Sequence, residues 1–164
     1  MIFTIKKNQH YSDQLFYKLC NFLNIVKVRQ WSVCFDESCK YDLSGPDQFD
    51  VNKLFGFSIG FNHHQESIRF GWRSFGQEIE LSAYAYISGK RTIETICTVP
   101  LNTQVDLFLE VESSNYRWAV FTRNSLYRET KIPKGEPFSV GYSLWPYFGG
   151  NQSAPHDMEI KIIN

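Results

Sequence analysis

The sequence has no excess of charge of either sign. Its 164 residues include 17 Lys and Arg side chains and 17 Asp and Glu side chains, so the formal net charge at pH 7 is +0. Nucleic acids and anionic membranes attract proteins through a surplus of positive charge. The balance therefore predicts neither nucleic acid nor a membrane as a partner, and it leaves room only for a local basic patch.

Long hydrophobic runs and a secretory leader are also missing. No stretch approaches the roughly 20 apolar residues that a helix needs to cross a bilayer. The first residues, Met1 to Lys7, do not combine a basic start with the apolar stretch and small-residue cleavage site of a signal peptide. We therefore expect a cytoplasmic location, with secretion as the alternative for a chain whose leader has been removed.

The cysteines lack the spacing of a metal site. Cys20, Cys34, Cys39 and Cys97 include neither a Cys-x-x-Cys pair nor a His at the spacing of zinc ligands. Reduced cysteines usually pack as small hydrophobic side chains. We assign no zinc site, and a disulfide between Cys34 and Cys39 stays open because spacing alone does not establish one.

One acidic cluster could hold a hard cation. It consists of Asp36, Glu37, Asp42, Asp47 and Asp50. Calcium takes about six to eight oxygen ligands, and some sandwiches carry a structural calcium. The segment lacks the alternating Asp/Asn spacing of a calcium loop, and its Gly45-Pro46 pair favours a solvated turn. The prediction is therefore no cofactor, with structural calcium as the alternative.

What the sequence does contain is a high share of aromatic residues, 16%, in short apolar or alternating runs. Gly, Pro, Asn and Asp separate these runs, as expected between strands. The predicted strands are Ile2 to Lys6, Gln30 to Phe35, Lys53 to Phe61, Ser67 to Arg73, Ile79 to Ser88, Thr92 to Val99, Gln104 to Glu112, Tyr116 to Thr122, Phe138 to Tyr147 and Met158 to Ile163. They predict one all-β domain over residues 1–164, a two-sheet antiparallel jelly-roll sandwich.

The segment Asp13 to Leu23 fits two structures. A helical stripe with Asp13 as its cap fits Leu15, Leu19, Phe22 and Leu23, whereas Leu15, Tyr17 and Leu19 alternate as in a strand. Because the rest of the pattern is made of strands, we predict strand and loop here.

Two middle strands present a polar face. The period of two places Arg69 and Arg73 on one side of their strand, and Glu80, Tyr84 and Tyr86 on one side of the next. The short connection between these strands makes them neighbours, which brings all five side chains to one surface. Tyrosine rings under sugar faces and charged hydrogen-bonding groups could bind a polysaccharide there. The simpler interpretation is a solvent-exposed face with a cross-strand Arg–Glu pair.

The last quarter of the chain combines aromatic, glycine and polar residues in the run Trp145 to Asn151. Its two glycines permit close approach of another chain or a ligand. Tyr147, Asn151 and His156 are therefore candidates for the rim of a binding site. The simpler interpretation is a tight corner with Trp145 packed in the core.

The pair His63-His64 lies in an expected hairpin loop. Paired imidazoles could ligate a metal or titrate in water. Adjacent residues on a strand point in opposite directions, which favours an ordinary loop.

Several strings resemble a group of small uncharacterised bacterial proteins of about this length. They are Trp31 to Leu43, Asp47 to Gly56, Phe70 to Arg73, and Tyr147 to Asn151 with Ala154-Pro155. The group is similar to the concanavalin A-like lectin and glucanase sandwiches. The resemblance implies carbohydrate as the first ligand class to test, and it assigns no site residue.

The enzymes of that superfamily carry motifs that this chain lacks. Laminarinase-type hydrolases place Glu-x-Asp-x-Glu on one strand, and the nearest strings here are Glu78-Ile79-Glu80 and Glu110-Val111-Glu112. Jelly-roll alginate lyases use a Gln-Ile-His strand and Tyr-Phe-Lys-Ala-Gly, of which only Tyr147-Phe148-Gly149-Gly150 is a partial match. Residues of the types that a lyase needs are nevertheless present, namely His63, His64, Arg69, Arg73 and Tyr84.

The sequence therefore predicts a noncatalytic, lectin-like domain that binds an oligo- or polysaccharide of unknown specificity. The predicted ligand-binding residues are Arg69, Arg73, Glu80, Tyr84, Tyr86, Tyr147 and Asn151, with no catalytic residue and no metal ligand. One alternative is a structural or protein-interaction domain without a glycan ligand. A second is a polysaccharide lyase or glycoside hydrolase with an atypical site.

Overall fold

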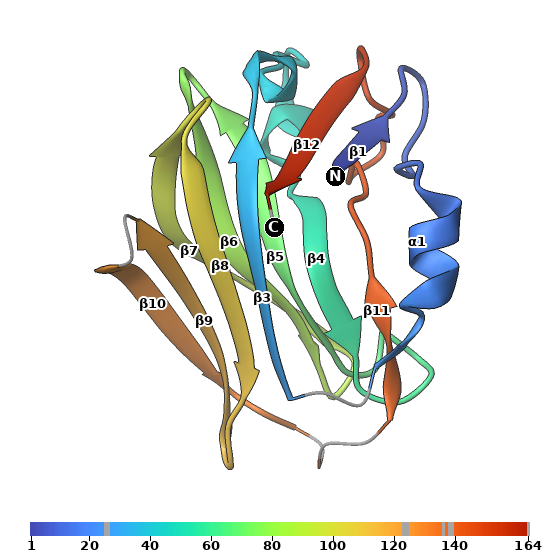
Figure 1. Ribbon diagram of the computed structural model, residues 1–164, viewed down its shortest axis with the longest axis vertical. Helices are drawn as coiled ribbons and strands as arrows, with labels where there is room; N and C mark the ends of the chain where they lie inside the picture. Colours follow the sequence, from blue (N-terminus) through green and yellow to red (C-terminus); the bar gives the residue numbers. More distant parts are fainter. Residues whose placement is uncertain (25–26, 123–124, 136, 138–139, 164) are drawn as a thin grey trace.

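Two six-stranded antiparallel sheets pack face to face in the computed structural model (Figure 1). The structure describes residues 1–24, 27–122, 125–135, 137 and 140–163. The predicted all-β, two-sheet antiparallel sandwich is thereby confirmed. No helix in these ranges is long and apolar enough to cross a membrane.

The first sheet has the order β1-β12-β3-β8-β9-β10. Its strands are β1 (Ile2–Ile5), β12 (Met158–Ile163), β3 (Val28–Phe35), β8 (Gln104–Val111), β9 (Asn115–Thr122) and β10 (Ser125–Pro133). The first and last strands of the chain pair with each other, so the two termini lie close together (Figure 1).

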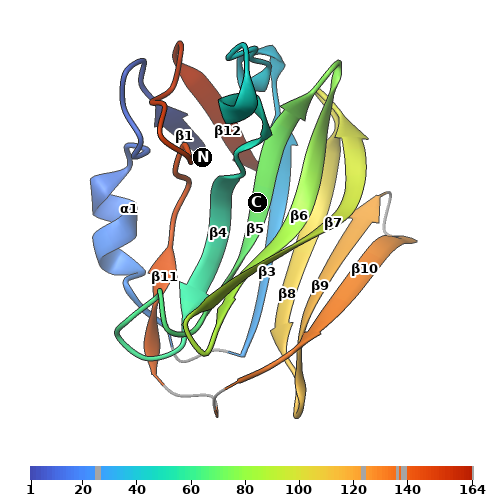
Figure 2. The same ribbon diagram turned by 180° about the vertical axis from the view of Figure 1, so that it is seen from behind.

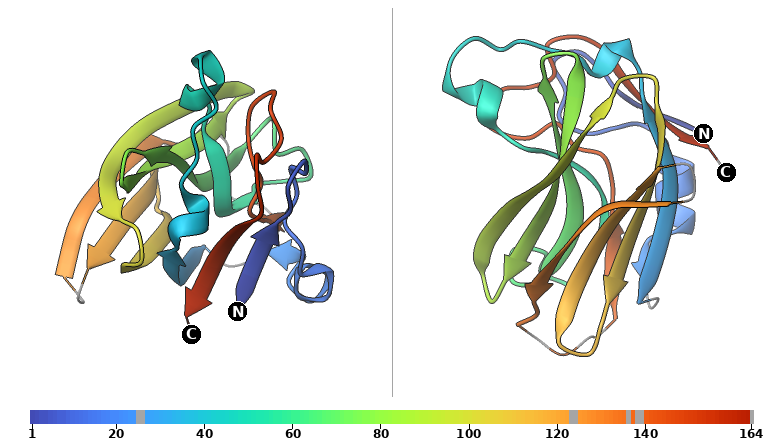
Figure 3. Two further views of the ribbon diagram at one scale, coloured as in Figure 1. Left: turned by 90° about the horizontal axis from the view of Figure 1, so that it is seen from above. Right: turned by 90° about the vertical axis from the view of Figure 1, so that its left-hand side faces the viewer.

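The second sheet has the order β2-β11-β4-β5-β6-β7 and lies nearer the viewer in Figure 2. Its strands are β2 (Leu23–Asn24), β11 (Gly141–Leu144), β4 (Asn52–Ser58), β5 (Ser67–Phe75), β6 (Glu78–Ile87) and β7 (Lys90–Pro100). Seen from above, the sheets curve as they cross the molecule (Figure 3). Two 3-10 turns, η1 (Glu37–Cys39) and η2 (Pro46–Phe49), lie in the connection from β3 to β4.

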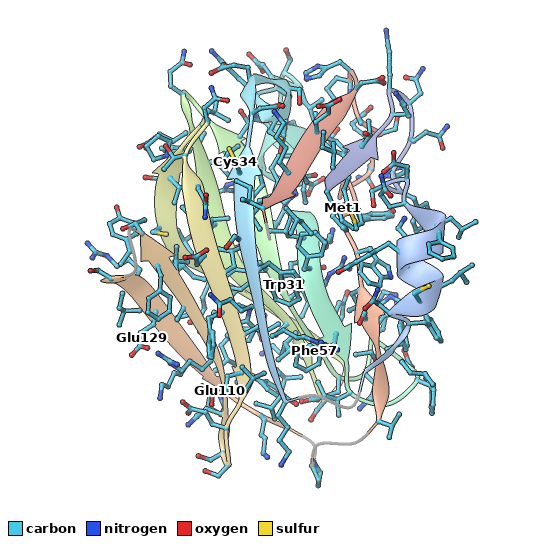
Figure 4. The ribbon with its side chains drawn as sticks, viewed as in Figure 1. Met1, Trp31, Cys34, Phe57, Glu110 and Glu129 are labelled. Carbon is cyan, nitrogen blue, oxygen red and sulfur yellow. The ribbon has the colours of Figure 1, made fainter. Side chains whose placement is uncertain are left out.

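Aromatic side chains fill the space between the sheets. Phe57 and Trp72 from the second sheet are buried together with Trp118 from the first. Trp31, labelled with Phe57 in Figure 4, stacks on Phe55 with ring centroids 5.5 Å apart. The high aromatic content thus serves the core of the sandwich.

The predicted strand and loop over Asp13 to Leu23 is wrong, because this segment contains the helix α1 (Leu15–Cys20). The helix satisfies its own backbone groups, as in the bond from Lys18 N to Gln14 O. It also turns Tyr17 inward, where that ring packs edge-on against Trp145 at 5.4 Å. Asp13 does not cap the helix, since its carboxylate accepts a hydrogen bond from the Thr4 amide.

The sequence did not predict β2 and β10, and the strand predicted for Phe138 to Tyr147 is too long. β10 has exposed side chains along most of its length, so its sequence shows no apolar alternation. β2 has only two residues. Of the strand predicted for Phe138 to Tyr147, only Gly141 to Leu144 forms β11 among the described residues, and Phe138 and Ser139 lie outside them.

The predicted faces of β5 and β6 are confirmed. The side chains of Phe70 and Trp72 are fully buried in the core. The two strands are neighbours, with Arg69 opposite Tyr84 and Arg73 opposite Glu80. The side chains predicted to share one polar surface, from Arg69 and Arg73 on β5 and from Glu80, Tyr84 and Tyr86 on β6, therefore lie on the outer face of the second sheet.

Candidate functional site

A cavity of about 690 Å³ opens on the outer face of the second sheet. Its floor comes from β4, β5 and β6, and its walls come from β11 with the segment after it and from α1 with the residues on either side of it. The arrangement of these elements can be followed in Figure 2. We call this cavity the groove. The ionisable and tyrosine side chains that line it are Tyr11, Lys18, Lys53, His63, His64, Arg69, Tyr84, Tyr86, Arg91, Tyr142 and Tyr147.

Strand register sets the floor of the groove. Leu144, Gly56, Arg69 and Tyr84 lie in one row across β11, β4, β5 and β6. The residue on β4 in this row is a glycine, and a Cβ there would come within 2.5 Å of Cα and 2.8 Å of Cβ of Arg69. The arginine side chain can therefore lie close over β4.

Arg69 is the central cation of the groove, and only 9% of it is exposed. Its Nη2 donates to the carbonyl oxygens of Leu54 at 3.1 Å and Trp145 at 2.5 Å. Its Nε is buried without a hydrogen-bond partner. Within the described ranges no carboxylate forms an ion pair with it. Burial lowers the pKa of Arg69 to about 10, so the group is still a cation at neutral pH.

Lys53 brings a second cation close to the first. Its Nζ lies 5.1 Å from the ring centroid of Tyr84 and 5.7 Å from that of Tyr147, within cation–π range. Burial, followed by the positive charges of Arg69 and Arg91, lowers the pKa of Lys53 to about 8. Lys53 therefore loses its charge at a pH just above neutral.

His63 and Tyr142 form a hydrogen-bonded pair at the same cavity. Nδ1 of His63 lies 2.6 Å from the Tyr142 hydroxyl. Burial, and then the charges of His64 and Arg69, lower the pKa of His63 below its ordinary value of 6.5. The histidine loop is therefore part of the groove wall instead of a free solvent loop.

Tyrosine rings form the flanks. Tyr84 and Tyr86 lie side by side on β6 with centroids 6.1 Å apart. On the opposite wall Tyr147 packs edge-on against Tyr11 at 5.0 Å, and its backbone pairs with that of Lys53. The groove thus offers aromatic faces on both sides of the cationic floor.

Of the seven predicted ligand-binding residues, the structure brings five into the groove: Arg69, Tyr84, Tyr86, Tyr147 and Asn151. Arg73 and Glu80 share the sheet face but lie outside the lining of the groove. They pair with each other, with Arg73 Nε 2.9 Å from a Glu80 carboxylate oxygen. That contact is the cross-strand pair of the simpler interpretation.

The other candidates have structural surroundings. His156 donates from Nε2 to the Ser38 carbonyl at 2.8 Å, away from the groove. Trp145 is half-buried against the core, as the corner interpretation expected. The four cysteines are free thiols, and burial raises the pKa of Cys39.

The acidic cluster does not converge on a point. Asp36 caps η1 by accepting from the Ser38 amide, and Asp42 accepts from the Ser44 amide. Among the described residues, no group of three or more His, Cys, Asp or Glu side chains could hold a metal ion.

The predicted ligand-binding residues do not include Lys53, His63 and Tyr142, which line the groove. The sequence singles out His63 only as a loop residue, a metal ligand or a residue for lyase chemistry, and it does not single out Lys53 or Tyr142. Lys53 and Gly56 both lie on the groove side because a register shift between them turns both Leu54 and Phe55 into the core. Two consecutive large apolar residues were the available signal for this bulge. The pairing of β11 with β4, which places Tyr142, has no local sequence signal.

No model of a known protein family matches the sequence, and no curated protein matches it. Solved structures do resemble the fold. An alginate lyase from Klebsiella pneumoniae superposes with a TM-score of 0.63 at 5% identity, over 86% of this chain and 57% of that one. An uncharacterized protein from Mycobacterium paratuberculosis gives 0.55 at 9% identity, over 99% and 80%. The superposition on the lyase shows a shared β-sandwich of jelly-roll type. The chain spans little more than half the length of the lyase.

Proposed function

We propose that the groove binds an acidic oligosaccharide whose sugars carry carboxylates. The observation that carries the proposal is Arg69, a buried cation with a free Nε and no carboxylate partner in the described chain. A buried charge without a counter-ion is costly, and an incoming carboxylate would relieve that cost. A guanidinium also binds a carboxylate through two parallel hydrogen bonds.

The surroundings of Arg69 fit a sugar as well as an anion. Tyr84, Tyr86 and Tyr147 present rings on which sugar faces can lie, and Lys53 adds positive charge. No Asp or Glu among the described residues lines the groove. The groove is therefore cationic even though the whole chain is neutral.

The fold agrees with this choice of ligand. The Klebsiella pneumoniae neighbour is named an alginate lyase, and alginate is a polymer of uronic acids. A lectin-like sandwich of the concanavalin A-like type is the form that we propose for this chain. Glycoside hydrolysis is disfavoured, because that chemistry needs two carboxyl groups at the cleaved bond.

The test compares two arginine variants in titration calorimetry with short oligomannuronates and with neutral manno-oligosaccharides of equal length. Arg69→Met should weaken acidic binding about 10- to 100-fold, since hydrogen bonds to charged groups contribute about 1.5–3 kcal/mol. Arg73→Met, on the same strand and face, should leave it within about twofold.

Equal affinity for neutral and acidic oligomers would contradict the proposal. Equal losses of affinity in Arg69→Met and Arg73→Met would also contradict it, because Arg73 lies outside the groove.

A second candidate, a protein-interaction domain, is favoured by one other observation. Leu15, Phe16 and Leu19 on α1 are 70%, 81% and 67% exposed, and Leu23 beside them is 65% exposed. Adjacent exposed apolar side chains are typical of contact surfaces. Light scattering would show whether the chain self-associates, and whether Phe16→Ser abolishes that association.

A further inference from the structure

We infer that the groove also cleaves its ligand by β-elimination, with Arg69 neutralising a uronate carboxylate and the Tyr142–His63 pair moving the protons. This inference rests on the proposed function and goes further, since it assigns an activity and a configuration of the sugar.

The reaction needs no water, oxidant or metal. A base removes the proton from C5 of a 4-linked uronate, and the electron pair forms the C4=C5 double bond. The bond from C4 to its bridging oxygen breaks, and that oxygen takes up a proton. The products are an unsaturated uronate at one new end and a hydroxyl at the other.

Arg69 is placed for the first part of this step. The proton on C5 is acidic only when negative charge can spread into the neighbouring carboxylate, and a buried cation stabilises that charge. The Nε of Arg69 is free to donate, while Nη2 is fixed by the carbonyls of Leu54 and Trp145. The guanidinium is therefore oriented before a ligand arrives, which is the arrangement that electrostatic catalysis requires.

The Tyr142–His63 pair supplies the proton transfer. The two atoms are 2.6 Å apart and come from different segments, the loop after β4 and strand β11. In a neutral imidazole protonated on Nε2, Nδ1 accepts the hydroxyl proton of Tyr142. Tyr142 can then take the C5 proton as its own passes to His63.

The surroundings hold the pair in place. The Ser67 hydroxyl donates to the His63 carbonyl at 2.7 Å, and the Phe22 ring stacks on Tyr142 with centroids 5.3 Å apart.

The Tyr142–His63 pair lies on one side of the sugar. It can therefore take the proton from C5 and return a proton to the oxygen that leaves C4 only on that same face. That route suits uronates in which the hydrogen on C5 and the oxygen on C4 lie on the same face, as in 1,4-linked mannuronate and glucuronate. Galacturonate has these two groups on opposite faces. We therefore expect polymannuronate or glucuronan as substrate, and polygalacturonate as a ligand that is held without being cut.

The experiment follows ultraviolet absorbance of the unsaturated product when the protein is mixed with polymannuronate, glucuronan and polygalacturonate. Affinity electrophoresis on the same three polymers reports binding separately. The first two polymers should gain absorbance, and all three should retard the protein.

Three variants assign the roles. Tyr142→Phe should lower the rate at least 100-fold and leave retardation within about threefold, and the matched Tyr127→Phe on exposed β10 should leave both unchanged. His63→Gln should lower the rate and remove the rise in rate with pH that comes from deprotonating His63 below pH 6.5.

The outcomes separate the two proposals. Retardation without absorbance on any polymer would overturn the lyase inference and leave acidic binding standing. The absence of both retardation and absorbance would overturn the lyase inference and the proposal of acidic binding. Cleavage of polygalacturonate alone, or a Tyr142→Phe variant as fast as the parent, would overturn the same-face route through Tyr142.

Discussion

Burial works against the charge of both central cations in the groove, Arg69 and Lys53. It lowers the pKa of the first to about 10 and of the second to about 8. A lowered pKa means that the folded state disfavours the protonated form, so each cation destabilises the empty protein relative to a solvated one. An anionic ligand recovers that free energy, which is the physical basis for binding here.

Lys53 makes the affinity of the groove for an anion depend on pH. The affinity for oligomannuronate should fall as the pH rises through about 8, because the lysine loses its charge there. The stability of the empty protein should change in the opposite sense. Between about pH 8 and the unfolded value of 10.5 the unfolded chain binds more protons at this site, so the free energy of unfolding should rise.

Calorimetry and urea denaturation across pH 7–10 measure these two effects in Lys53→Met and in the control Lys7→Met, which removes an exposed lysine. Both dependences should be missing from the first variant and present in the second. An unchanged pH profile in Lys53→Met would refute the assignment.

Strand β4 shapes the floor of the groove. Its register shift turns Leu54 and Phe55 into the core together, and Gly56 then leaves the space over which Arg69 lies. The alternation in β5 and β6 was enough to predict Arg69, Tyr84 and Tyr86 on one face, because the period of two is a local property. The pairing of β11 with β4 depends on contacts between distant segments, and no local pattern contains it. The bulge and the helix α1 do have local signals, the consecutive Leu54 and Phe55 and the helical stripe after Asp13, but alternation or a strand fits each segment as well.

Gly56→Ala tests this role of β4. The added Cβ would lie 2.1 Å from the Ile68 carbonyl oxygen, so backbone must move. We expect a loss of about 1–3 kcal/mol in the free energy of unfolding and a loss of oligomannuronate binding. The control Gly76→Asn changes a turn glycine with open space around it and a positive φ that Asn tolerates. It should keep both properties, and urea denaturation with calorimetry measures them.

The core between the two sheets supports the floor of the groove. The Trp118 indole on β9 donates to the Arg69 carbonyl at 2.9 Å, which ties the first sheet to the floor of the groove. On the other side of the first sheet, Arg117 lies between Glu110 and Glu129, labelled in Figure 4, and forms ion pairs with both. Carboxylates thus neutralise cations on that outer face, whereas in the described part of the groove Arg69 has none.

In the proposed complex, Arg69 receives the carboxylate of an acidic sugar. The side-chain Nε–H signal of Arg69 in a ¹⁵N-correlated NMR spectrum, assigned by its loss in Arg69→Met, reports this contact directly. Titration with a short oligomannuronate should shift that signal in a saturable way, and the neutral manno-oligosaccharide of equal length should not. A stationary Arg69 signal while the acidic oligomer binds elsewhere would show that Arg69 does not receive the carboxylate.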